Sequence, residues 1–181
     1  MIVAISGKSG CGNTTVSRLL AQRLGVRLVN YTFRNIAAER GVGLAEIIEA
    51  ARGDDWYDIH VDTRQVELAH EADCVIGSRL AIWKLPDATL RVYLTASAEV
   101  RAERIRQRPH GQGPEGGDRE TVLAFTLERD SQDHARYKRL YGLDNDDYSF
   151  ADLVINTELF LPPEVVDIIA IACARTSHKL R

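Results

Sequence analysis

The stretch MIVAISGKSGCGNTTVSRLL, residues 1–20, joins a short apolar run to a glycine-rich loop and then to a mixed polar and apolar segment. The run MIVAI is typical of a strand that is buried on both faces. From Val16 to Leu24 the apolar residues recur at helical spacing, and Gly25 marks the end of that helix. The stretch therefore predicts a strand, a tight loop and a helix in succession.

The same alternation continues along the chain. Apolar runs predict further strands at 26–30, 74–77, 90–94 and 152–157. Helical patterns separate them at 34–51 (with a break at 40–43), 57–72, 97–108, 119–141 and 162–174. Because strands that alternate with helices pair in parallel, we expect an α/β fold with a five-stranded, mostly parallel sheet and helices on both faces. We find no repeat and no linker, so we expect a single domain over residues 1–181.

The loop SGKSGCGNTT, residues 6–15, is close to the Walker A motif G-x-x-x-x-G-K-[ST]. Glycines let a backbone curl so that its N–H groups converge on an anion at a helix N-terminus. Thr14 occupies the hydroxyl position that ordinarily holds Mg²⁺, and Thr15 is placed to bond an α-phosphate oxygen. We therefore predict a phosphate site formed by Gly7, Lys8, Ser9, Gly10, Cys11, Gly12, Asn13, Thr14 and Thr15.

Asn13 stands where the motif has its lysine, and an amide carries no charge. Lys8 is the nearby cation, and we hypothesise that it folds over the phosphates and supplies part of the missing charge. The alternative is a Lys8 side chain that points to solvent. Cys11 lies beside a helix N-terminus, which can lower a thiol pKa, so it is either reactive or a small residue that fills the loop.

Composition excludes several classes of protein. A net charge of −3 gives no basic field, so we expect no nucleic-acid partner. The cysteines, Cys11, Cys74 and Cys173, are odd in number and far apart, which favours a reduced cytosolic protein over a disulfide scaffold. The longest apolar stretch, near 168–174, is too short for a membrane span. With no leader before the first strand, we expect a soluble, cytoplasmic protein. We also expect a monomer.

Seven segments of the chain carry a resemblance to a known family. They are ISGKSGCGNTTVS (5–17), FR (33–34), VDTRQVELA (61–69), SRLAIW (78–83), VRAERI (100–105), RYKRLYG (136–142) and DLVINT (152–157). In these segments the chain resembles the cytidylate kinases, in the short, archaeal-type branch of the P-loop nucleoside monophosphate kinases. That branch also lacks the Walker lysine.

The resemblance implies an ATP-dependent kinase that uses Mg²⁺ and transfers the γ-phosphoryl group to CMP, and also to dCMP. It implies an NMP-binding region near 30–72 and a lid near 109–118, where four glycines and two prolines fall in ten residues. It further implies that Arg34, Arg64 and Arg79 reach the acceptor phosphate and that Arg104 and Arg108 border the lid on the donor side. Arg79 is the best placed of these residues physically, because it directly follows a strand.

Arg129, Asp133 and Arg136 are three or four residues apart and share one helix face. The resemblance implies that Asp133 contacts ribose or base and that the arginines approach phosphates. Lys8, from its place in the loop, and Arg129 are the candidate catalytic cations. A surface ladder of ion pairs is the alternative for such a face. One departure concerns Mg²⁺: relatives often have Glu-Gly-Arg where this chain has Gly77, Ser78 and Arg79, so a carboxylate is missing there.

Three functions remain open at this point. The first is a CMP kinase, and the second is a P-loop kinase for another small acceptor such as AMP, UMP or shikimate. The third is a nucleotide sensor that binds ATP without transferring phosphate, which the missing lysine favours. The arginines on the acceptor side favour an enzyme, because phosphoryl transfer requires concentrated positive charge more than a base.

Overall fold

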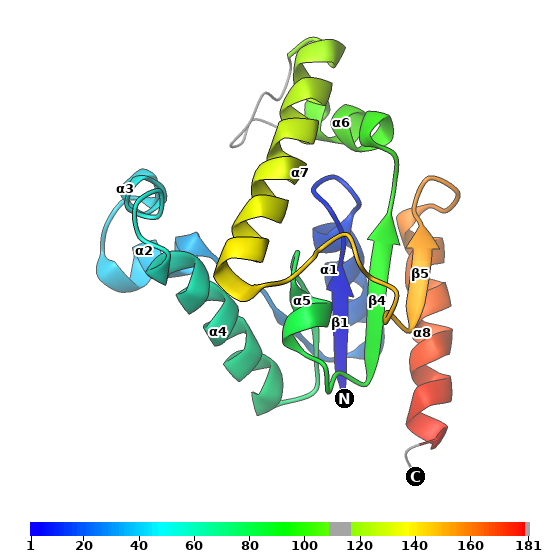
Figure 1. Ribbon diagram of the computed structural model, residues 1–181. Coiled ribbons are helices and arrows are strands. Elements are labelled where there is room, and N and C mark those ends of the chain that lie inside the picture. The colour runs from blue at the N-terminus through cyan, green and yellow to red at the C-terminus, as the bar shows by residue number, and fades with distance from the viewer. Residues whose placement is uncertain (109–116, 180–181) are drawn as a thin grey trace.

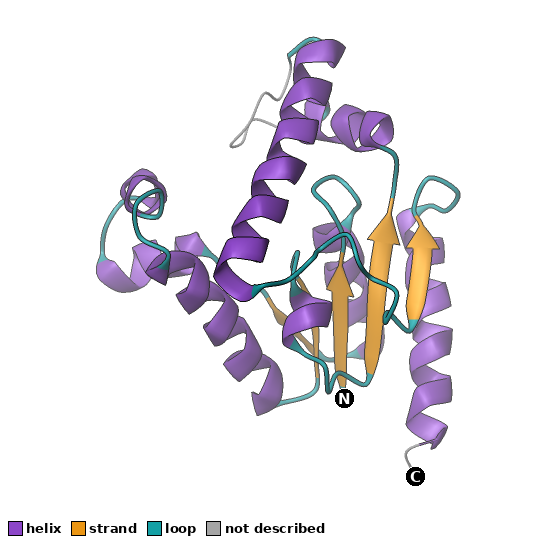
Figure 2. Cartoon of the chain, viewed as in Figure 1, coloured by secondary structure: helices purple, strands orange, loops and turns teal. Residues whose placement is uncertain are grey.

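The computed structural model describes residues 1–108 and 117–179. Within them the strands form one sheet, ordered β2-β3-β1-β4-β5, and all four pairings are parallel. The strands are β1 (Ile2–Ser6), β2 (Arg27–Val29), β3 (Cys74–Gly77), β4 (Leu90–Thr95) and β5 (Leu153–Asn156). Figure 2 shows these strands running in one direction among the helices. The predicted five-stranded parallel sheet is confirmed.

Helices connect successive strands as the sequence pattern predicts. They are α1 (Asn13–Leu24), α2 (Phe33–Arg40), α3 (Leu44–Ala50), α4 (Trp56–Glu71), α5 (Ala81–Lys84), α6 (Ala98–Arg106), α7 (Arg119–Tyr141) and α8 (Pro162–Lys179). The predicted helix at 34–51 divides in two because Gly41 ends α2 in the left-handed conformation. Most of the predicted lid near 109–118 lies outside the described residues. None of the described helices is both long and apolar enough to cross a membrane.

The two faces of the sheet pack against different helices. Side chains alternate along β1, so Val3 and Ile5 join a core with α1 and α8, whereas Ala4 joins one with α4 and α5. Figure 1 shows α8 beside β4 and β5, with α4 and α5 on the other side of β1. Apolar residues thus fill both layers, which explains why the strands read as continuous apolar runs.

The position of β1 determines where a site can form. β1 lies at the centre of the sheet, between β3 and β4, and the chain leaves it in one direction to reach β2 and later returns to add β4 and β5 on the other side. In open parallel sheets, ligands bind beyond the carboxyl ends of the strands at such a switch point. The glycine-rich loop follows β1 there, and α6 and α7 stand above the same edge (Figure 1).

Candidate active site

The loop between β1 and α1 is held in a conformation that requires glycine. Gly10 and Gly12 have φ of +88° and +102°, which residues with a Cβ rarely adopt. At Gly7, an added Cβ would lie 2.5 Å from the carbonyl oxygen of Leu94 in β4. No side chain among the described residues caps the start of α1, so its first N–H groups are free to bind an anion.

Asn13 braces this loop from within. Its Nδ2 donates to the carbonyl oxygen of Gly7 at 2.6 Å, across the loop. Its Oδ1 is buried and has no hydrogen-bond partner among the described residues. The residue that replaces the Walker lysine therefore holds the loop closed but adds no positive charge.

Two further arginines support the loop from α6. Arg101 is buried, donates to the carbonyl oxygen of Ser9 at 3.2 Å and pairs with Asp130 at 2.6 Å. Arg104 donates to the carbonyl oxygen of Gly10 at 3.3 Å and to the hydroxyl of Thr157 at 2.8 Å. Because their guanidinium groups are committed to the protein, we assign both arginines a structural part in the loop.

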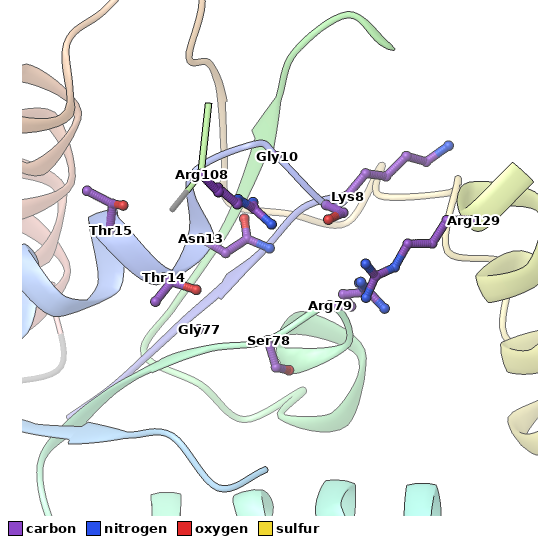
Figure 3. Close-up of a pocket in the computed structure, with 12 residues that line it drawn as sticks. Lys8, Gly10, Asn13, Thr14, Thr15, Gly77, Ser78, Arg79, Arg108 and Arg129 are labelled. Atoms are coloured by element: carbon purple, nitrogen blue, oxygen red, sulfur yellow. The ribbon is translucent and has the colours of Figure 1, made fainter. Parts of the chain in front are cut away.

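A cavity of about 480 Å³ opens over the loop. The predicted residues that line it are Lys8, Ser9, Gly10, Gly12, Asn13, Thr14, Thr15, Arg79, Arg108 and Arg129. Figure 3 shows these side chains arriving from opposite sides, with Thr14 and Asn13 on α1 and Arg79 beyond β3. We call this space the phosphate-loop cavity.

Two arginines of the phosphate-loop cavity lack an ion-pair partner among the described residues. Neither Arg108 nor Arg129 forms an ion pair with any residue in the described part of the chain. Burial, followed by the nearby charge of Arg79, lowers the pKa of Arg129. Neighbouring cations repel one another, so this arrangement is stabilised when an anion enters.

The side chain of Lys8 extends away from the phosphate loop. Its Nζ pairs with Asp146, in the loop after α7, at 2.6 Å. In Figure 3 its side chain extends away from Asn13 and Thr14. Lys8 is therefore neither over the loop nor simply in solvent, and its role at the phosphates stays a prediction that requires it to leave Asp146.

Cys11 lines a second cavity instead, of about 520 Å³, which adjoins the first at Gly10, Gly12, Thr15 and Arg108. One wall of this cavity is apolar and consists of Leu159, Phe160, Leu161, Pro162 and Val165. We call it the apolar side cavity. Burial raises the pKa of the Cys11 thiol, which favours its interpretation as a small residue that fills the loop over a reactive one.

A third cavity, of about 400 Å³, lies between α3 and α4 on one side and α7 on the other. It meets the phosphate-loop cavity at Arg79 and Arg129, which line both. Asp133 and Arg136 also line it, so α7 carries three of the predicted residues into one space. We call it the acceptor-side cavity.

A chain of charged contacts runs along the acceptor-side cavity. Arg79 Nη1 lies 2.8 Å from Asp133 Oδ2, and Arg136 Nη2 lies 2.9 Å from Asp133 Oδ1. Arg136 Nη1 then lies 3.6 Å from Asp58 Oδ1 on α4. Asp133 is 7% exposed, and these partners come from three separate elements, which argues against a surface ladder of ion pairs along α7.

Arg34 and Arg64 lie elsewhere. Arg34 is exposed on α2, and Arg64 pairs with Glu67 on its own helix; neither lines the three cavities. Asp58 faces α7, and six residues later Arg64 is turned by about 240° around the helix, since each residue adds 100°. The contact of Arg34 and Arg64 with an acceptor phosphate therefore stays a prediction.

Sequence reasoning missed several residues of the site. On the acceptor side these are Phe33, Ile48, Arg52, Asp55, Asp58, Gln132 and Arg139. A helical pattern at 57–72 was visible, but which of its faces meets α7 depends on tertiary packing. The spacing of Asp55, Asp58 and Asp62, three and four residues apart, is the one signal that could have indicated an acidic face.

Comparisons with known proteins agree with this geometry. Residues 2–159 match the family described as the cytidylate kinase-like family. The chain is 44% identical over 173 residues to cytidylate kinase 2 of Borrelia garinii, covering 93% of this chain and 94% of that protein. It is 37% identical to the cytidylate kinase of Pyrococcus horikoshii, covering 95% and 88%. The crystal structure of shikimate kinase from Aquifex aeolicus has the same fold, with a TM-score of 0.61 at 19% identity over 98% of both chains.

Proposed function

The chain belongs to the cytidylate kinase-like family, and on that premise we propose that it transfers the γ-phosphoryl group of ATP to CMP, giving ADP and CDP. The observation that carries the proposal is the junction of two cavities at Arg79 and Arg129. A donor phosphate over the loop and an acceptor phosphate in the acceptor-side cavity would meet at these arginines. Phosphoryl transfer requires this convergence of positive charge on two reactants held in line.

We place ATP with its triphosphate over the loop and its adenine in the apolar side cavity. The backbone N–H groups at the start of α1 would donate to phosphate oxygens. Leu159, Phe160 and Leu161 supply apolar surface, and all three are exposed in the free protein. Covering them with a base removes apolar area from water, which favours binding.

Mg²⁺ fits the residues present, although few of them are ligands. Thr14 brings one hydroxyl into the phosphate-loop cavity, and Ser78 brings another from the opposite wall. Mg²⁺ keeps several waters and is bound largely by substrate phosphates, so a site with few protein ligands suits it. Thr14 would hold the ion, which neutralises charge on the phosphates when bound.

We place CMP with its phosphate at Arg79 and Arg129 and its ribose beside Asp133. Asp133 already pairs with Arg79 at 2.8 Å. The same carboxylate can therefore orient Arg79, which binds the phosphate, and accept a hydrogen bond from a ribose hydroxyl. The same placement accommodates dCMP, because deoxyribose keeps a 3′-hydroxyl that can donate to Asp133. Arg34 and Arg64 belong to the NMP-binding region near 30–72 and would reach the phosphate only if that region moves.

The charge of the missing lysine has three candidate sources. Arg108 and Arg129 line the phosphate-loop cavity and pair with no described carboxylate, and Lys8 adds a third cation once it leaves Asp146. We assign the transition-state contact to Arg129 and Lys8 and the donor-side contact to Arg108. No partner chain is required by this arrangement, so we propose that the monomer is active.

Phosphorylation rates on a panel of acceptors test the proposal. Purified protein with Mg-ATP is given CMP, dCMP, UMP, AMP or shikimate, and the phosphorylated product is identified. We expect CMP and dCMP to be phosphorylated fastest. A faster rate on shikimate or AMP would indicate a kinase for another acceptor, and ATP binding with no phosphorylated product would indicate a sensor.

A further inference from the structure

The backbone carbonyl oxygens of the glycine-rich loop all have hydrogen-bond donors from residue 7 to residue 11. The first two accept from within the loop, and the next three accept from side chains outside it. The outside donors to residues 9, 10 and 11 are, in order, Arg101, Arg104 and Thr157. The conformation of the loop is therefore set in large part by neighbouring elements.

Arg101 on α6 orients the peptide unit between Ser9 and Gly10. In a planar trans peptide the C=O and N–H groups point in opposite directions. Because Arg101 Nη1 donates to the Ser9 carbonyl oxygen at 3.2 Å, the Gly10 N–H points away from the guanidinium. That N–H bonds to no described residue, and Gly10 lines both cavities assigned to ATP. It is thus available to donate to a phosphate oxygen.

Asp130 on α7 holds Arg101 in turn. Its two carboxylate oxygens accept from Nη1 and Nη2 of Arg101 at 3.1 Å and 2.6 Å, which makes the ion pair bidentate. The side chains are 5% exposed for Arg101 and 12% exposed for Asp130. Since a guanidinium buried this deeply requires a counter-charge, the position of Arg101 depends on Asp130. α6 also packs closely on the loop, because a Cβ added at Gly10 would lie 2.8 Å from Arg101 Cβ.

We propose that Asp130, acting through Arg101, is a positioning residue that shapes the glycine-rich loop for the phosphates of the donor nucleotide. The inference rests on the placement of ATP given under the proposed function. Asp130 lines none of the phosphate-loop, apolar side and acceptor-side cavities, so it acts without touching either substrate. Asp133, three residues further along α7, instead pairs with Arg79, where we place the acceptor phosphate. Two neighbouring carboxylates of one helix therefore serve different substrates.

The test measures the Kd for Mg-ATP and the Kd for CMP separately, by titration calorimetry, in the wild type and in Asp130→Asn. Asparagine keeps the shape of the side chain but removes its charge and one acceptor of the bidentate pair. We expect the Kd for Mg-ATP to rise by roughly tenfold or more. The Kd for CMP should change by much less, because Asp130 does not line the acceptor-side cavity. A general structural defect would weaken the binding of both nucleotides alike.

Asp152→Asn is the matched control. Asp152 forms the same kind of bidentate pair with Arg91, at 3.1 Å and 2.9 Å. This pair lies at the start of β4, at the edge of the sheet opposite to the glycine-rich loop, and lines none of the three cavities. Asp152→Asn removes the same charge from the same kind of pair, so both dissociation constants should stay unchanged.

Arg101→Lys is a second variant, and it keeps the positive charge. A lysine ammonium can still pair with Asp130, but it lacks the planar fork that reaches Asp130 and the Ser9 carbonyl oxygen together. We expect the Kd for Mg-ATP to rise in this variant too, and the Kd for CMP to change by much less. If Asp130→Asn does not fold, an unchanged Kd for Mg-ATP in Arg101→Lys overturns the proposal.

The outcomes separate this proposal from the proposed function. An unchanged Kd for Mg-ATP in Asp130→Asn, or an equal loss of affinity for CMP, overturns the role of Asp130, whereas CDP formation by the wild type would still support the CMP kinase. No binding of Mg-ATP by the wild type overturns both. A loss of affinity that is selective for Mg-ATP in Asp130→Asn, and absent in Asp152→Asn, supports the positioning role.

Discussion

Asp133 on α7 and Arg79 beyond β3 form an ion pair at 2.8 Å, and this contact stands where the phosphate-loop cavity meets the acceptor-side cavity. Arg79 is one of two residues shared by both cavities, so its position affects both reactants. Because Asp133 also contacts Arg136, one buried carboxylate fixes two cations along the path from phosphate to base. In the proposed placement, this arrangement would align two nucleotides in a site without the Walker lysine.

Asp133→Ala should therefore impair use of CMP more than binding of ATP. Removing one partner of a buried ion pair costs about 3–5 kcal/mol, because the remaining charges are left uncompensated. We expect kcat/KM for CMP to fall by about 100-fold or more. The KM for ATP, measured in the same assays, should change by much less, because Asp133 itself does not line the phosphate-loop cavity. A normal kcat/KM for CMP would show that Asp133 does not position Arg79.

Arg108→Ala should lower kcat, because Arg108 lines both cavities assigned to ATP and pairs with no carboxylate in the described part of the chain. Arginines that stabilise phosphoryl transfer contribute about 10³-fold or more in related chemistry, and we expect a loss of at least about tenfold here. Arg106→Ala is the control. Arg106 lies two residues earlier but pairs with Glu103 at 2.7 Å, outside the three cavities. Equal effects of the two variants would contradict a specific role for Arg108.

Lys8 and Asp146 can be tested as a pair. If Lys8 leaves Asp146 to bind phosphate, Lys8→Ala should lower kcat at saturating ATP by about tenfold, as expected for one charge-assisted contact. Asp146→Asn frees the ammonium and should leave kcat unchanged or raised. Unchanged turnover in Lys8→Ala would place the missing charge on the arginines alone.

Thr14 should determine the dependence on Mg²⁺. Thr14→Val keeps the shape of the side chain and removes the hydroxyl that we assign to the ion. We expect the Mg²⁺ concentration for half-maximal rate to rise by about tenfold or more, and Thr14→Ser to restore it. Identical Mg²⁺ titrations of wild type and Thr14→Val would exclude Thr14 as a ligand.

The fold could be predicted largely from the sequence because its signals are local. Apolar runs, glycines and helical spacing gave every strand and most helices. α5 was not predicted, since Ala81–Lys84 is a single turn whose period cannot be recognised in four residues. The order of the strands also required the structure, because parallel neighbours are far apart in the chain.

Residues of the site could be predicted only where several of them fall within one motif or on one face of a helix. The glycine loop is one continuous stretch of sequence, and so is the 129–136 segment of α7. The structure places the residues of these two stretches around adjoining cavities. The contact of Lys8 with Asp146, and that of Asp58 with Arg136, each join distant segments. These two contacts depend on how the helices pack on the sheet, so residue type and spacing in the sequence did not indicate them.

The most direct test of the central claim is ³¹P NMR of purified protein with Mg-ATP and CMP. The account predicts that ADP and CDP appear in equal amounts while ATP and CMP are consumed. ADP with free inorganic phosphate and no CDP, or no change in a protein that binds ATP, would contradict it.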